Sequence, residues 1–137
     1  MRYALFDTSI YIGFWEQGLY VSILEQVRQA FIVRHSSVVL SELYRGGKTK
    51  QALQLVEHLY KLSKSCWTPD EADWRAAGKI LRQLNFQYGW QARKIQNLQN
   101  DVLIALTARK YGATVVTANR RDFEELRSHV RFSTIYV

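Results

Sequence analysis

The chain has 137 residues, of which 47% are hydrophobic and 23% are charged, and this balance is typical of one globular domain over residues 1–137. The formal net charge of +7 favours a polyanionic partner such as nucleic acid, although many soluble proteins are basic without such a partner. The single cysteine, Cys66, excludes an internal disulfide and a thiolate-based metal centre, and it favours a reducing, cytoplasmic location.

Short apolar runs predict strands, and apolar residues at helical spacing predict helices between them. In chain order we predict a strand at 3–6, helices at 10–16 and 20–30, a strand at 31–33, helices at 37–45 and 50–64, a strand at 65–67, helices at 69–88 and 98–111, a strand at 113–117, a helix at 121–127 and a strand at 132–136. Strands that alternate with helices pair in parallel, with helices on both faces of the sheet. The sequence therefore predicts an α/β protein.

Several local signals refine these elements. Thr68 is predicted as the N-cap of the helix that follows it, with Pro69 in the first turn and Glu71 closing a capping box. The apolar N-terminus contains Asp7 and is not a convincing signal peptide, and no apolar run approaches the length of a membrane span. Most of the 12 acidic residues, Asp73 among them, are expected on solvated helix faces.

Four acidic residues occupy less ordinary positions. Asp7 ends an apolar strand, where it either faces a cleft or caps the next helix. Glu42 is the one acid in an apolar helix, and its alternative is a place on the solvated stripe of that helix. Asp101 and Asp122 lie near predicted helix starts, where an acid also favours the helix dipole. Each of the four has a structural alternative when it is considered alone.

Taken together, these acids predict a site. Asp7 and the loop from Asn119 to Asp122 follow strand ends that meet at one edge of a parallel sheet, and the two helix acids can project toward that edge. Two carboxylates 4 Å apart repel by roughly 4 kcal/mol at an effective dielectric constant near 20, so a cluster needs protons or a divalent cation. A site of oxygen ligands alone favours Mg²⁺ or Mn²⁺, which suits metal-assisted phosphodiester cleavage.

Four segments resemble the motifs of one known family. They are Phe6-Asp7-Thr8-Ser9, Ser41-Glu42-Leu43, Asn100-Asp101 followed by Ile104-Ala105, and the run from Val115 to Phe123. Their order and spacing resemble those of PIN domains, and most closely the VapC-like toxins of type II toxin–antitoxin pairs. The resemblance implies a three-layer α/β/α sandwich with a central parallel sheet. It also implies a Mg²⁺-dependent endoribonuclease that acts on RNA, forms a homodimer and binds a cognate antitoxin.

The resemblance also assigns roles to residues. By motif match, Asp7, Glu42 and Asp101 are the catalytic, metal-binding acids. Position 119 is Asn where many members have Asp, so the fourth carboxylate is either absent or supplied by Asp122, and the number of bound metals stays open. In the structural alternative Asn119 is an N-cap and Asp122 reaches back to it. Supporting and RNA phosphate-binding roles fall on the following residues: Thr117 and Asn119 as supports, and Arg120, Arg121, Arg93 and Lys94 at phosphates.

Three rival hypotheses remain at the sequence level. The chain is a PIN-like module that binds RNA or protein without catalysis, a phosphotransferase with Asp7 as nucleophile, or a structural protein in which every acid is a cap. The second faintly resembles haloacid dehalogenases, which have another Asp where this chain has Ser9. Metal binding and trapping of a phospho-aspartate separate the three.

Overall fold

The computed structural model of the chain describes residues 2–62, 66–89 and 92–137. Five strands form one sheet in the order β3-β2-β1-β4-β5, and every neighbouring pair is parallel. The strands are β1 (Tyr3–Phe6), β2 (Ile32–Ser36), β3 (Cys66–Trp67), β4 (Thr114–Thr117) and β5 (Ser133–Tyr136).

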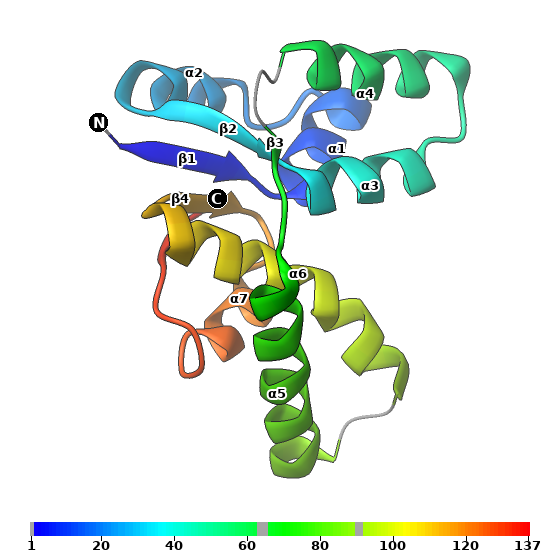
Figure 1. The fold of residues 1–137 in the computed structure, drawn as a ribbon. Helices are drawn as coiled ribbons and strands as arrows, with labels where there is room; N and C mark the ends of the chain where they lie inside the picture. Colours follow the sequence, from blue (N-terminus) through cyan, green and yellow to red (C-terminus); the bar gives the residue numbers. More distant parts are fainter. Residues whose placement is uncertain (1, 63–65, 90–91) are drawn as a thin grey trace.

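Helices cover both faces of this sheet (Figure 1). They are α1 (Thr8–Gln17), α2 (Val21–Ala30), α3 (Ser37–Gly46), α4 (Lys50–Leu62), α5 (Glu71–Tyr88), α6 (Ala92–Tyr111) and α7 (Arg120–Leu126). Parallel strands are joined by right-handed crossovers, so connections that run toward β3 and toward β5 place their helices on opposite faces. Helices α1 to α4 therefore lie on one face and α5 to α7 on the other. The predicted α/β/α sandwich with a parallel sheet is confirmed.

The central strands are buried on both faces. Residues 4–6 of β1 are at most 3% exposed, and Val115 and Val116 of β4 are fully buried. Continuous apolar strands of this kind are the pattern of parallel sheets covered by helices. Residues 102–106 in the middle of α6 are also at most 1% exposed, because this helix packs against β1 and β4 and also contacts α3, α5 and α7. The core thus surrounds the segment that follows Asp101.

The strand order reverses between β1 and β4, and this reversal positions the site. From β1 the chain moves through α1 and α2 to β2, whereas from β4 it moves through α7 to β5 on the other side. The connections leave the two strands in opposite directions, so a crevice opens at their carboxyl ends. Asp7 follows β1 directly and Asn119 follows β4 by two residues.

The predicted start of α5 is wrong. The N-cap is Asp70, not Thr68, and its side chain accepts a hydrogen bond of 2.9 Å from the backbone N–H of Asp73. The reciprocal partner is Asp73, not Glu71, since the Asp73 carboxylate accepts from the Asp70 N–H at 3.0 Å. Asp73 is only 6% exposed, so the predicted solvated position is also wrong. The reason is tertiary: Lys110 at the end of α6 pairs with Asp73 at 2.5 Å.

Other boundaries shift by a few residues. Helix α6 begins at Ala92 instead of residue 98, because its first two turns are mostly polar and offer no apolar stripe to detect. Tyr20 is the N-cap of α2, with a φ of 66°, and β2 spans Ile32–Ser36 instead of 31–33. The predicted helix over 50–64 ends at Leu62, and residues 63–65 lie outside the described ranges. Across the described ranges, no helix has both the length and the apolar character needed to cross a membrane.

Candidate active site

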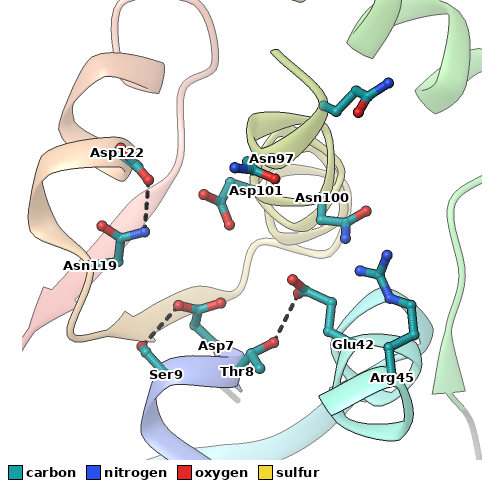
Figure 2. Close-up of a pocket in the computed structure, with 11 residues that line it drawn as sticks. Asp7, Thr8, Ser9, Glu42, Arg45, Asn97, Asn100, Asp101, Asn119 and Asp122 are labelled. Atoms are coloured by element: carbon teal, nitrogen blue, oxygen red, sulfur yellow. Dashed lines mark hydrogen bonds between the residues drawn. The ribbon is translucent and has the colours of Figure 1, made fainter. Parts of the chain in front are cut away.

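A polar cavity of about 440 Å³ opens at the carboxyl ends of β1 and β4 (Figure 2). The four acids singled out by the sequence all line it, and they come from four different elements. The cavity is lined by Asp7, Thr8, Ser9, Glu42, Arg45, Gln96, Asn97, Asn100, Asp101, Asn119 and Asp122. Figure 2 shows Asp7, Glu42 and Asp101 around its centre, with Asp122 on one side and Arg45 on the other.

Asp7 is fixed by hydroxyl groups. It is 4% exposed, and its Oδ2 accepts hydrogen bonds from the hydroxyls of Thr117 at 2.8 Å and Ser9 at 2.9 Å. The Ser9 Oγ also accepts from the backbone N–H of Ala118, which ties this network to the end of β4. Asp7 stands at the N-cap position of α1, but its side chain makes no capping hydrogen bond. Its carboxylate therefore lines the cavity and does not act mainly as a helix cap.

The pKa of Asp7 is raised above its ordinary value. Burial is the largest cause, and the hydrogen bonds from Thr117 and Ser9 oppose it. Those hydroxyls donate to the ionised form, which is why they lower the pKa. Because both act on Oδ2, they hold the side chain in one orientation.

Glu42 lies in the middle of α3, and it is half-buried. Its Oε1 accepts a hydrogen bond of 2.9 Å from the hydroxyl of Thr8, which joins α3 to the start of α1. Burial raises the pKa of Glu42 most, the charge of Asp7 raises it further, and contacts with Thr8, Asn100 and Arg45 lower it. The predicted alternative, a place on a fully solvated stripe, does not fit this position.

Asp101 carries the largest electrostatic strain. Its pKa is raised to about 9, first by burial and then by the charges of the other three acids: Asp7, Glu42 and Asp122. The side chain is 9% exposed, and no hydrogen bond donor among the described residues contacts it. At neutral pH, without a cation, this carboxyl is therefore protonated. Three negatively charged neighbours disfavour the ionised form of this buried carboxyl. A cation bound beside it would therefore be most stabilising at this position.

Asn119 and Asp122 form a pair at the start of α7. The Asn119 Nδ2 donates to Asp122 Oδ2 at 3.0 Å, and the Asn119 side chain makes no hydrogen bond that caps the helix. The Asn119 N–H instead donates to the hydroxyl of Thr117 at 2.9 Å. Asn119 is thus the N-cap residue of α7 and Asp122 reaches back to it, as the structural alternative predicted, but the hydrogen bond joins the two side chains and orients the Asp122 carboxylate that lines the cavity.

Of the four predicted phosphate-binding residues, Arg120, Arg121 and Lys94 lie outside this cavity. The guanidinium of Arg120 lies 4.4 Å from the ring centroid of Tyr136, and Arg121 is exposed on α7. Lys94 is half-buried near the start of α6. The side chain of Arg93 lies outside what the structure describes. A role at RNA phosphates stays a prediction for these four residues.

Sequence reasoning missed the uncharged and basic part of the cavity. Arg45 follows Glu42 by three residues on α3, and Gln96 precedes Asn100 by four on α6, so each pair shares a helix face. Asn97 precedes Asp101 by four residues in the same way. Helical spacing from the two helix acids was the signal that could have found these residues.

The donor chemistry suits a hard divalent cation. The acids supply carboxylate oxygens, and Ser9, Thr8 and Asn97 add further neutral oxygens, which are the ligand types of Mg²⁺. Within residues 2–62, 66–89 and 92–137, however, no three acidic, histidine or cysteine side chains are close enough together to hold one ion. The carboxylates face the cavity but stand apart, as like charges do.

The chain is therefore an α/β sandwich of parallel strands with an acidic crevice at the strand-order reversal. The PIN-domain model matches residues 4–128, so the chain belongs to the PIN-domain family. The family resemblance seen in the four motifs is thereby confirmed. A comparison with curated proteins gives no significant match.

Solved structures share the fold over almost the whole chain. VapBC2 from Rickettsia felis, bound to a DNA fragment from its promoter, is 22% identical with a TM-score of 0.69, covering 98% of each chain. VapBC-1 from nontypeable Haemophilus influenzae is 22% identical with a TM-score of 0.71, covering 98% of this chain and 97% of that one. DNA-bound VapBC from Salmonella typhimurium is 23% identical with a TM-score of 0.68, covering 98% of each chain.

The raised pKa of Asp101 predicts how stability depends on pH without metal. Folded Asp101 keeps its proton up to about pH 9, whereas an unfolded Asp releases it near pH ~4. Between these values the folded state binds more protons than the unfolded state, so the free energy of unfolding falls as pH rises. We expect the melting temperature in chelator to fall from pH 5 to pH 9, and Asp101→Asn to remove most of that fall. Equal pH slopes in both proteins would show that Asp101 is not strained.

Proposed function

We propose that this PIN domain, residues 1–137, is a Mg²⁺-dependent endoribonuclease and the toxin of a toxin–antitoxin pair. The observation that carries the proposal is the meeting of Asp7, Glu42 and Asp101 in one cavity, where burial first and the neighbouring charges second raise the pKa of Asp101 to about 9. A site without catalytic or metal-binding use has no physical reason to keep buried acids that repel one another.

In the proposed mechanism each acid has a distinct task. Asp7 and Asp101 bind Mg²⁺, with Mn²⁺ able to substitute, and Glu42 either completes the ligand set or orients a water molecule. When bound, the ion supplies a water of lowered pKa and neutralises charge on the attacked phosphate. Ser9 and Thr117 hold the Asp7 carboxylate by its Oδ2. Asn119 holds Asp122 toward the cavity in the same manner.

The substrate and partners are also proposed. A net charge of +7 favours attraction of a polyanion, and family membership supports RNA as that polyanion. Arg120, Arg121, Arg93 and Lys94 are proposed to hold flanking phosphates. The fold is shared with VapBC structures, and this likeness supports a cognate antitoxin. A homodimer and a cytoplasmic location complete the proposal.

The rival hypotheses are weaker once the site is known. Membership of the PIN-domain family argues against a phosphotransferase, and the place of Asp7 in the cavity beside the other acids argues against a purely structural acid. One observation favours a PIN-like binding module without catalysis, since no three acids in the described part of the chain stand close enough to hold an ion. The two hypotheses differ in one observable: the nuclease cleaves RNA when metal is added, and the binding module does not.

RNA cleavage should require Mg²⁺ or Mn²⁺ and stop in chelator. Asp101→Asn should lower the cleavage rate by at least roughly a hundredfold, about 2.7 kcal/mol in the transition state, because it removes a metal ligand and little volume. The measurement is single-turnover cleavage of a labelled RNA, with the melting temperature of the variant as a control for folding. A wild-type rate after exhaustive chelation or in this variant would overturn the metal mechanism.

Asp122 should contribute to the reaction and not merely to the helix. We expect Asp122→Asn to lower the cleavage rate or metal affinity by at least roughly tenfold, equal to about 1.4 kcal/mol. The helix-start alternative predicts a loss of roughly 0.5–1 kcal/mol of stability with near-normal cleavage. Rate and melting temperature, measured at saturating and limiting Mg²⁺, separate the two. Glu124→Gln is the matched control, since it removes an exposed acid from the same helix.

The toxin role has a cellular consequence. Expression of this chain alone in bacteria should slow growth, and coexpression of the protein encoded beside it should restore growth. Asp101→Asn, produced at the same level, should be harmless. The measurement is growth after induction, with soluble folded protein verified by immunoblot. Normal growth of cells that contain the active nuclease would count against a toxin.

A further inference from the structure

Strand β5 forms one edge of the sheet, and the side of it that faces away from β4 is uncovered. Its one neighbour in the sheet is β4, and no other described element contacts it extensively. The opposite edge is formed by β3, which is two residues long, whereas β5 has four. The β5 sequence contains Thr, Ile and Tyr, which favour strands, and neither the Pro nor the Lys that often protect an edge. This strand is therefore a suitable template for a further strand.

The hydrogen bonds of the sheet identify the backbone groups that β5 presents outward. The carbonyl of Thr117 in β4 accepts from the N–H of Val137 at 3.1 Å, so residue 137 points its backbone toward β4. Backbone groups alternate in direction along a strand, and the N–H and C=O groups of Thr134 and Tyr136 therefore point away from β4. Within the described ranges, neither residue makes a backbone hydrogen bond outside the sheet. Four strong hydrogen-bonding groups line this edge.

The side chains of the same two residues lie against α7 and its C-terminal cap. Arg127 Nη1 donates to Thr134 Oγ1 at 3.4 Å. The guanidinium of Arg120 lies over the ring of Tyr136, 4.4 Å from its centroid. Neighbouring strands of a sheet share its faces, so every second side chain of a strand added beside β5 would point toward these two arginines.

The charge beside this edge is mainly positive. Arg120 and Arg127 are exposed, and neither forms a salt bridge with a described residue. Arg131, two residues before β5, is exposed and likewise has no such partner. Glu124 lies on the same side of α7 as the first two arginines by helical spacing, and it offsets one of the three charges. The complement of this surface is therefore acidic.

Two other occupants fit the edge less well. A symmetric pair of β5 strands would bring Arg120 and Arg127 of one copy toward the same residues of a second copy, and like charges on neighbouring strands are destabilising. RNA has the right charge, but its backbone lacks the row of alternating donors and acceptors that an edge strand pairs with. An extended acidic peptide supplies both the backbone groups and the negative charge.

We propose that the outer edge of β5 binds an extended, acidic segment of a partner protein, which adds a sixth strand to the sheet. Thr134 and Tyr136 supply the backbone hydrogen bonds. Arg127 and Arg120 pair with two acidic side chains that are separated by one residue in the partner, a spacing of about 7 Å along a strand. None of these four residues lines the acidic cavity, so the inference does not depend on the nuclease function.

Amide hydrogen exchange tests the added strand directly. The probe is an eight-residue peptide that alternates glutamate with valine, added to the whole protein and followed by NMR. Near saturation we expect exchange at the amides of Thr134 and Tyr136 to slow at least about tenfold. The amides of Ile135 and Val137 already face β4 and should change little. A peptide that alternates lysine with valine is the matched control and should not bind. Binding of the acidic peptide without slower exchange at Thr134 and Tyr136 would overturn the proposal.

Methylation of the peptide backbone separates strand addition from attraction by charge alone. One version carries N-methyl groups on its glutamates and the other on its valines, so each version blocks one edge of the peptide strand. Only one version should bind, because an added strand pairs through the edge that faces β5, and the version that binds reports the direction of the strand. Equal affinity of the two versions, or loss of binding by both, would contradict strand addition.

Thr134→Pro tests the edge from the protein side. It removes an N–H that points away from β4, so the ladder with β4 is retained, and proline is tolerated at such positions of edge strands. We expect at least about tenfold weaker peptide binding, whereas Thr134→Ala keeps the N–H and should bind within about twofold. Arg127→Gln should weaken binding about threefold and reduce its salt dependence. Arg75→Gln, which removes an exposed charge from α5, should change neither.

The same variants separate the other occupants. A folded Thr134→Pro protein, verified by its melting temperature, that binds the peptide like the wild type would show that the edge is not the site. If this variant fails to fold, the methylated peptides still decide, since they are tested on the wild-type protein. Conversion of a wild-type dimer into a monomer by Thr134→Pro, measured by analytical ultracentrifugation, would assign the edge to a second copy and overturn the proposal. None of these measurements uses RNA cleavage, so the nuclease can fail while the edge stands, and the reverse.

Discussion

Negative charge gathered at one edge of a parallel sheet is the constraint that the rest of this structure accommodates. Four segments of the chain bring carboxylates to the same cavity, and hydrogen bonds from side chains hold three of the four. Hydroxyls hold Asp7, Thr8 holds Glu42 and Asn119 holds Asp122. Asp101 has no such partner among the described residues, and its pKa rises to about 9, first through burial and then through the charges of the other acids. The electrostatic strain of the site is thus greatest at Asp101, whose helix, α6, is the most deeply packed.

The strain at Asp101 persists because packing in the core fixes the position of α6. The residues after Asp101 are fully buried between the sheet and the neighbouring helices, so their packing fixes the position of the carboxyl. Burial of residues 102–106 contributes far more stability than one protonated acid removes. The same helix also brings the side chains of Gln96, Asn97 and Asn100 to the cavity, where Asn100 contacts Glu42.

Much of the architecture could be predicted from local sequence. Buried strands such as Tyr3–Phe6 and Thr114–Thr117 are continuous apolar runs, and the alternation of strands and helices implies the parallel sheet. The acids of the site could be named because each interrupts an apolar pattern or fits a family motif. The start of α5 could not, because Thr68 and Asp70 both satisfy the same capping rule. Lys110, 37 residues away from Asp73, stabilises the second choice.

The sequence by itself determined the fold class, the family motifs and the edge of the sheet at which Asp7 and Asn119 meet, because period and strand-end position are local properties. Only the tertiary structure decided what surrounds each acid. It showed that Asn119, at the N-cap position of α7, donates its side-chain amide to Asp122, and it placed Arg45 in the cavity while Arg120 packs over Tyr136. Hydrogen-bond partners and burial depend on which elements are neighbours in space, and a linear pattern carries that information only in part.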